Sequence, residues 1–291
     1  MSPTRIPTED DFTPLKSQGL TVQLTYPSAG RESTTAILLI FHGLGDSEAP
    51  FASFAHNLSL PGVLAISVRG VSPLPPALLG LPLDSGPTSN FHWGDDLSLN
   101  PATGDLDPDP GFTKARDLVL GSLVRGVLLQ SCGWEYDDLL LFGFGQGGSL
   151  ALGLASVLRN LKPEGEEGEE EDRVREVTDE TKDEVVVKGK KNMSDAKPKV
   201  FKGVVSIGGA LPASMIPTVS SREKSKTPVL VCHGRESEAV DEDAVDVLKD
   251  EFADVRVVKW KRPDDGMPRN RDEVLPMMEF FAERLKAGWS G

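Results

Sequence analysis

Cysteine and histidine are scarce in this chain, which has two cysteines and four histidines among 291 residues. Cys132 and Cys232 are too few for the disulfide framework of a small secreted protein, and they indicate a reducing, cytoplasmic compartment. No apolar run approaches the ~20 residues that a transmembrane helix needs. The opening stretch, MSPTRIPTEDDFTPL, lacks the apolar core of a signal peptide. The sequence therefore predicts neither export nor a membrane span.

Positive charge is also in deficit. Lysine and arginine number 31 against 45 aspartates and glutamates, which gives a formal net charge of −14. Nucleic-acid binding depends on clustered lysine and arginine that neutralise phosphates. The charge balance therefore argues against nucleic acid as a partner.

Hydrophobic residues, 38% of the chain, form short runs that alternate with helical patterns. Most runs are continuously apolar, as expected of parallel strands covered on both faces. The predicted strands are 20–26, 36–41, 63–68, 139–142, 203–207, 229–232 and 255–260. The predicted helices are 112–130, 147–161 and 272–285, with a further one around FASFAHNL. This alternation predicts an α/β fold with a mostly parallel, doubly wound sheet and helices on both faces.

Three segments lie outside this alternation. Residues 1–18 are predicted to form a flexible N-terminal tail, and residues 19–291 are predicted to form one domain. Residues 163–199 interrupt that domain with a charged, acidic-then-basic insertion that is low in large apolar groups, a composition that predicts disorder. Within it, Val185–Val187 is a candidate for a short edge strand. Residues 72–110 are rich in proline, glycine and aspartate, and long loops of this kind often form lids or binding loops.

The most informative stretch is DLLLFGFGQGGSL, residues 138–150. A strand leads into a glycine-rich turn and then a helix, which is the layout of the nucleophile elbow G-x-S-x-G. Here Gly145 occupies the serine position, between Gly143 and Gly147. The sequence therefore predicts an elbow without its nucleophile.

A second turn, FHGLGD at residues 41–46, directly follows the apolar run AILLI. In hydrolases with a nucleophile elbow, such a turn supplies one N–H of the oxyanion hole, and the residue after the nucleophile supplies the other. The predicted donors are the backbone N–H groups of Leu44 and Gln146.

Four motifs occur in order: HGLGD (42–46), GFGQGG (143–148), SIGGALP (206–212) and CHG (232–234). On these motifs the chain resembles the phospholipase/carboxylesterase family, which includes the acyl-protein thioesterases. The resemblance covers roughly residues 20–291 apart from the charged insertion. It implies an α/β-hydrolase sheet and an apolar acyl-binding groove, with no metal and no organic cofactor.

At the positions of the catalytic residues, this sequence differs from the family pattern. Members of the family cleave esters and thioesters with a Ser-His-Asp triad, whose serine position here is Gly145. The acid position of the pattern H-G-D-x-D falls on Ser237, with Glu236 or Glu238 as carboxylates one residue away.

The histidine position falls in the loop 262–272, RPDDGMPRNRD, which contains no histidine. Met267 or Pro268 lies nearest the expected place. His42 and His233 belong to HG turns and are matched in the family as structural residues, and His56 lies in a predicted helix. The chain therefore has no histidine where the base is expected.

The resemblance also suggests which residues border the groove. Trp93, in HWGDD at residues 92–96, is expected to pack at the groove wall, with His42 and His92 beside it. One histidine next to two carboxylates gives too few ligands for a metal site, so none is predicted.

Three functional hypotheses follow. In the first, the fold has kept its groove and lost its triad, which makes a pseudo-hydrolase that binds an acyl or ester ligand, a lipidated protein or another protein partner. In the second, the chain is an active carboxylesterase or thioesterase with a relocated nucleophile such as Ser149 or Ser206, although a nucleophile needs a base within hydrogen-bond reach. In the third, the acidic insertion recruits a protein partner.

Overall fold

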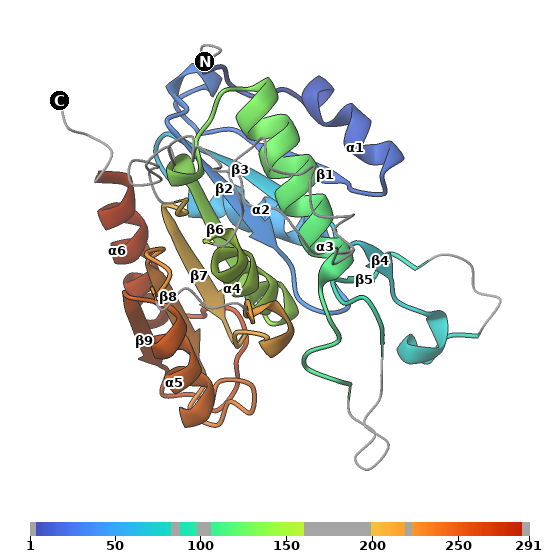
Figure 1. Cartoon of the computed structure of the whole chain (residues 1–291), viewed down its shortest axis with the longest axis vertical. Helices are drawn as coiled ribbons and strands as arrows, with labels where there is room; N and C mark the ends of the chain where they lie inside the picture. Colours follow the sequence, from blue (N-terminus) through green and yellow to red (C-terminus); the bar gives the residue numbers. More distant parts are fainter. Residues whose placement is uncertain (1–3, 83–87, 98–105, 160–198, 219–222, 287–291) are drawn as a thin grey trace, which may run out of the picture.

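The computed structural model describes residues 4–82, 88–97, 106–159, 199–218 and 223–286. Its centre is a seven-stranded sheet in the order β1-β3-β2-β6-β7-β8-β9 (Figure 1). Neighbouring strands are parallel except for β1, which pairs antiparallel with β3 at one edge. The predicted mostly parallel α/β sheet is therefore confirmed.

The strands begin and end close to the predicted positions, because continuous apolar runs are covered on both faces of the sheet. They are β1 (Val22–Thr25), β2 (Ala36–Phe41), β3 (Val63–Val68), β6 (Leu139–Phe144), β7 (Gly203–Ile207), β8 (Val229–His233) and β9 (Val255–Lys259). A separate two-stranded sheet joins β4 (Ser72–Pro73) to β5 (Phe91–His92). It lies within the long loop that the sequence predicts.

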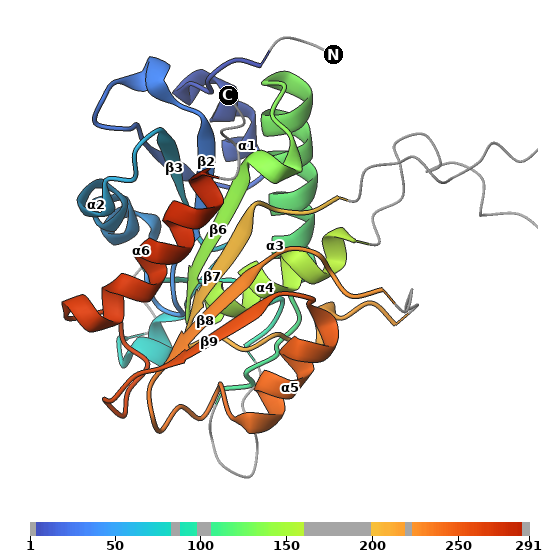
Figure 2. The same ribbon diagram turned by 90° about the vertical axis from the view of Figure 1, so that its left-hand side faces the viewer.

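Helices cover both faces of the main sheet (Figures 1 and 2). On one face lie α2 (Glu48–Leu58) and α6 (Arg271–Lys286). On the other lie α1 (Thr13–Ser17), α3 (Thr113–Arg116), the π-helix η4 (Asp117–Ser131) that continues α3, α4 (Gln146–Leu158) and α5 (Glu242–Glu251). The sequence analysis missed α5, which begins where the Asp241 carboxylate accepts the N–H of Ala244 at 2.8 Å.

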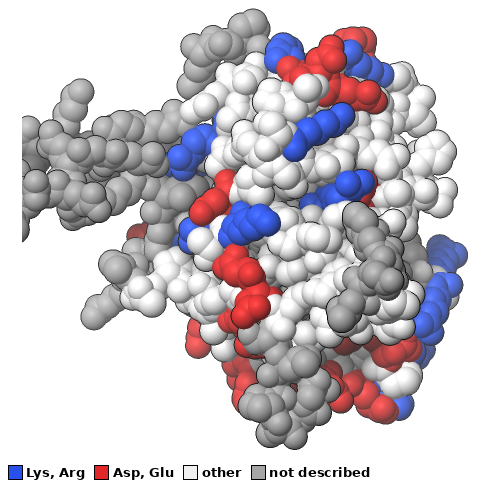
Figure 3. All heavy atoms as spheres, turned by 90° about the vertical axis from the view of Figure 1, so that its right-hand side faces the viewer, with Lys and Arg blue, Asp and Glu red and all other residues white. Residues whose placement is uncertain are grey.

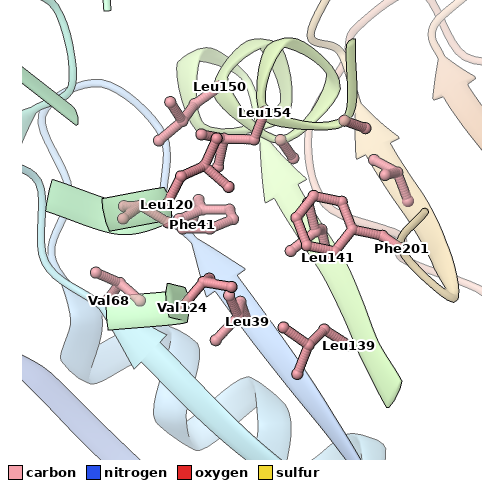
Figure 4. Close-up of a cluster of buried hydrophobic side chains, with 14 of the residues drawn as sticks. Leu39, Phe41, Val68, Leu120, Val124, Leu139, Leu141, Leu150, Leu154 and Phe201 are labelled. Carbon is pink, nitrogen blue, oxygen red and sulfur yellow. The ribbon is translucent and has the colours of Figure 1, made fainter. Parts of the chain in front are cut away.

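Strand β2 shows how the two faces are built. Ile37, Leu39 and Phe41 join the core beneath α4 and η4, whereas Leu38 and Ile40 join the core beneath α2 and α6. Figure 4 shows the first of these cores, where side chains from α4 and η4 meet those of β2 and β6. This packing holds the start of α4 against the ends of β2 and β6, where the candidate site lies.

The N-terminal segment corrects one prediction. Residues 4–18 are not a free tail, because Phe12 and Leu15 are buried in the core beside η4. Arg5 forms an ion pair with Asp11, and the Trp134 indole N–H donates to the Arg5 carbonyl at 2.9 Å. Two apolar side chains three residues apart lie on the same side of a helical segment and can anchor it to the core. The average composition of residues 4–18 is polar, so it does not reveal this anchor.

The predicted disordered insertion, including Val185–Val187, lies outside the described residues except for Lys199. Next to it, Arg159 pairs with the buried carboxylate of Glu251 at 3.0 Å, and the Ser156 hydroxyl donates to the same carboxylate at 2.6 Å. On the face drawn in Figure 3, acidic and basic side chains lie in small adjacent groups. None of the helices described is both long and apolar enough to cross a bilayer.

Candidate active site

The turn between β6 and α4 has the strained conformation of an elbow. Gly145 has φ 51° and ψ −121°, in the region that side chains rarely adopt. Its N–H donates to the Ile207 carbonyl at 2.8 Å, and its own carbonyl accepts the N–H of Gly148 at 2.8 Å. The tip of the elbow is therefore fixed from both sides without any side chain.

The flanking glycines are required by close backbone approach. A Cβ on Gly143 would collide with the Gly147 backbone, and a Cβ on Gly147 would collide with the carbonyls of Phe41 and His42. Gly145 differs, because the nearest atom to an added Cβ is the Gly43 Cα at 3.9 Å, an ordinary contact. The elbow thus has room for a side chain at its tip and lacks one.

The structure brings the HG turn and the elbow together, since the Gly43 Cα lies 3.9 Å from the position of a Cβ added at Gly145. Gln146 is the first residue of α4, so its N–H has no acceptor within the helix. Leu44, the other predicted donor, has a side chain that is 41% exposed at the surface of the turn. Their roles as oxyanion donors remain predictions.

His42 begins the HG turn that lies beside this tip, and both of its ring nitrogens are engaged. Nε2 accepts the N–H of Gly70 at 2.8 Å, so Nδ1 carries the proton and donates it to the Gly43 carbonyl at 2.7 Å. Burial lowers the pKa of His42, which favours this neutral form. The imidazole therefore has no free lone pair with which to act as a base.

Among the described residues, none of the remaining histidines shows a hydrogen bond to a serine hydroxyl. His233 ends β8 and its Nδ1 lies 2.8 Å from the Gly234 carbonyl, as the Nδ1 of His42 lies against the Gly43 carbonyl. His92 is buried on β5, and its Nδ1 has no hydrogen-bond partner. His56 lies on α2, away from the elbow, beside a hollow lined by Leu24 and Thr25.

The acid position contains a hydroxyl that bonds to a carboxylate from another loop. The Ser237 hydroxyl donates to Asp265 at 2.7 Å, and the N–H of Gly234 donates to the other oxygen of that carboxylate at 2.7 Å. Glu236 and Glu238, the alternatives from the sequence, are exposed instead. Sequence analysis missed Asp265 because it lies in the loop where the family pattern places a histidine.

That loop is rebuilt around an arginine. The Arg262 guanidinium stacks 4.3 Å from the Trp260 ring centroid, lies 3.4 Å from the buried Glu273 carboxylate and donates to the carbonyls of Gly266 and Met267. Met267, the residue nearest the expected histidine position, packs with its side chain against the core under α6. The backbone of the loop 262–272 is thus held by the contacts of Arg262 and Met267, and neither residue can serve as a triad histidine.

Trp93, which the sequence predicts at the groove wall, is held in place by hydrogen bonds to the HG turn and to α4. Trp93 is fully buried, its indole N–H donates to the His42 carbonyl at 2.8 Å, and its backbone N–H donates to the Gln146 side chain at 2.8 Å. Asp95 accepts the N–H groups of Thr113 and Lys114 at 2.7 and 2.8 Å, so it caps α3. In the ranges that the structure describes, no three potential metal ligands lie together.

Neither relocated nucleophile has a suitable setting. Ser206 is fully buried, and its hydroxyl donates to the Gly209 carbonyl at 2.8 Å. Ser149 lies on the buried face at the start of α4, with 9% of its surface exposed. Neither shows a hydrogen bond to an imidazole, the contact that activates a serine.

Comparisons with known proteins agree with this architecture. Residues 27–163 match the family model described as Phospholipase/Carboxylesterase. An uncharacterized hydrolase of Schizosaccharomyces pombe is 34% identical over 124 residues, which are 42% of this chain and 47% of that protein. An uncharacterized hydrolase of Mycosarcoma maydis is 30% identical over 132 residues, 43% and 42% of the two chains. The chain thus matches less than half the length of these two relatives.

Solved structures share the whole fold. Acyl-protein thioesterase 2 of Zea mays superposes with a TM-score of 0.58 at 20% identity, over 91% of this chain and 99% of its own. The carboxylesterase of Bacillus cereus superposes with a TM-score of 0.53 at 14% identity, over 95% and 100%. At such identities the likeness shows the fold alone.

Proposed function

Because this chain is an α/β-hydrolase of the phospholipase/carboxylesterase family, matched over residues 27–163, we propose that it binds an acyl ester or thioester without hydrolysing it. The observation that carries the proposal is the tip of the elbow. Gly145 has the elbow backbone, with room for a Cβ and no atom that can attack.

The surroundings of the tip support a loss of chemistry rather than its relocation. His42, the first residue of the neighbouring HG turn, has both ring nitrogens engaged with backbone groups. The carboxylate of Asp265 accepts hydrogen bonds from Ser237 and Gly234 and not from an imidazole. Without a nucleophile and its base, a bound ester has no partner for acyl transfer.

What remains is suited to holding a carbonyl. The N–H of Gln146 stands at the N-terminus of the thirteen-residue helix α4, whose dipole favours the partial negative charge of a carbonyl oxygen. Leu44 lies in the turn whose Gly43 Cα is the nearest atom to a Cβ added at Gly145. An acyl group on a small molecule or on a lipidated protein would present the same carbonyl to these donors.

The test uses a matched pair of probes: the octanoyl thioester of N-acetylcysteamine, and the S-octyl thioether that lacks its carbonyl. We expect calorimetry to show that the thioester binds roughly thirtyfold more tightly, since two neutral hydrogen bonds contribute about 1 kcal/mol each. Mass spectrometry of the incubated thioester should find it intact.

A fluorophosphonate, which labels activated serines covalently, tests the alternative that the protein is an active hydrolase. We expect the intact mass of the protein to be unchanged after exposure to it. A single labelled serine, such as Ser149, together with release of octanoate, would replace this proposal with an active hydrolase. Equal affinity for thioester and thioether would show that the carbonyl is not recognised.

A further inference from the structure

The segment Asn90–Trp93 contacts both halves of the proposed carbonyl site. At one end it binds the HG turn: the N–H of Gly45 donates to the Phe91 carbonyl at 2.9 Å, and the N–H of Phe91 donates to the Asp46 carbonyl at 2.9 Å. The Asn90 side-chain amide also donates to the Gly45 carbonyl at 2.5 Å. The two residues that follow Leu44 are therefore tied to this segment.

At its other end the segment binds the start of α4. The backbone N–H of Trp93 donates to the side-chain oxygen of Gln146 at 2.8 Å. The Trp93 ring is fully buried, packs edge-on against Phe41 with centroids 5.4 Å apart, and donates its indole N–H to the His42 carbonyl. Residues 90–93 are thus hydrogen-bonded to both the HG turn and α4, and they pack against Phe41 at the end of β2.

The segment is also supported from behind. A Cβ on Gly70 would lie 2.7 Å from the His92 carbonyl oxygen and 3.0 Å from the Phe91 Cβ, so the backbone that follows β3 packs directly against the segment. The Arg69 guanidinium lies 4.9 Å from the Phe91 ring centroid and forms a bidentate ion pair with the largely buried Glu48 at the start of α2. The segment is therefore clamped between the sheet and the site.

We infer that Asn90–Trp93 is a brace that sets the spacing of the Leu44 and Gln146 N–H groups, with the Gln146 side chain as a positioning group rather than a ligand contact. The inference rests on the proposed function for the meaning of that spacing. Donors that act on a carbonyl oxygen must be placed within a fraction of an ångström, and they are effective only when neighbouring groups lock them there. The Gln146 side-chain oxygen accepts the Trp93 N–H, and its backbone N–H belongs to the first residue of α4, where no acceptor within the helix is available.

Three variants test the brace. Gln146→Met removes the side-chain acceptor at nearly constant length, and Gln146→Glu keeps an acceptor oxygen. Gln23→Met, on the exposed face of β1, is the matched control. The first measurement is amide hydrogen exchange, which requires no ligand. We expect the amides of Gly45 and Phe91 to exchange at least about tenfold faster in Gln146→Met than in the parent protein, and to stay protected in Gln146→Glu and Gln23→Met. Unchanged protection in Gln146→Met would overturn the brace.

Binding provides the second readout. Gln146→Met should weaken the thioester about tenfold and leave the thioether within about twofold, whereas Gln146→Glu should restore most of the difference. A merely structural role would weaken both probes alike, which would overturn the inference. If the parent protein binds neither probe, the proposed function fails, and the exchange measurement still decides whether the brace exists.

Discussion

The hydroxyl of Ser237 donates to the carboxylate of Asp265, with the two oxygens 2.7 Å apart. In the family pattern the residue at position 237 is the acid and the loop around 265 carries the base. Here the acid position holds a hydroxyl, and the loop supplies the carboxylate. Because the carboxylate also accepts the N–H of Gly234, it fastens the loop to the end of β8.

Placing an acid at position 237 should therefore lower the stability of the fold. Ser237→Asp would set two carboxylates side by side, and their repulsion should lower the free energy of unfolding by on the order of 2 kcal/mol at neutral pH. The double variant with Asp265→Asn should recover most of that loss. Urea unfolding of the two variants and of Glu236→Asp, an exposed control, measures this. Equal stability of Ser237→Asp and the parent would contradict it.

Restoring the nucleophile alone should not restore catalysis. Gly145→Ser has room for its Cβ, yet it lacks a base, so hydrolysis of p-nitrophenyl octanoate should stay near background. The positive φ should cost about 1–2 kcal/mol of stability, and Gly145→Ala should cost the same. Strong turnover by the serine variant, with none by the alanine variant, would show that a base is present after all.

The elbow should tolerate no side chain at its flanks. In Gly143→Ala the new methyl would overlap the Gly147 backbone, and we expect a loss of more than about 3 kcal/mol or failure to fold. Gly121→Ala, exposed on η4 with nothing within 4 Å of the new Cβ, should be neutral or more stable by up to about 1 kcal/mol. Thermal unfolding distinguishes them, and similar melting temperatures for the two variants would argue against close packing at the elbow.

Stability should fall on mild acidification. Burial lowers the pKa of His42, His92 and His233 below the ordinary imidazole value of about 6.5. Between that value and the lowered ones, the unfolded chain binds protons that the native protein does not. The free energy of unfolding should then drop with decreasing pH, by up to ~1.4 kcal/mol per pH unit for each imidazole.

Urea unfolding from about pH 7.5 to pH 5.5 tests this dependence. His92→Gln should make the slope shallower, because it removes one of the buried imidazoles. Gln23→Met, which removes no titratable group from the exposed face of β1, should leave the slope as it is. A pH-independent stability in the parent protein would show that these imidazoles titrate alike in both states.

The sequence predicted much of the fold because the relevant signals are local. The runs 36–41, 63–68 and 203–207 became β2, β3 and β7 with the same bounds, since apolar residues buried on both faces leave little freedom in where a strand begins and ends. Residues 4–18 escaped prediction because two apolar side chains decide their docking, and only the surface that receives them reveals it.

The absence of an attacking atom at position 145 was settled by the sequence alone, because glycine has no side chain in any fold. The tertiary structure decided everything that depends on partners distant along the chain: the Gly70 N–H that engages His42, the Asp265 carboxylate at the acid position, and the hydrogen bond of the Gln146 side chain to Trp93. Such hydrogen bonds join residues up to 53 positions apart and form only when the ends of the strands meet, so local sequence patterns contain no trace of them.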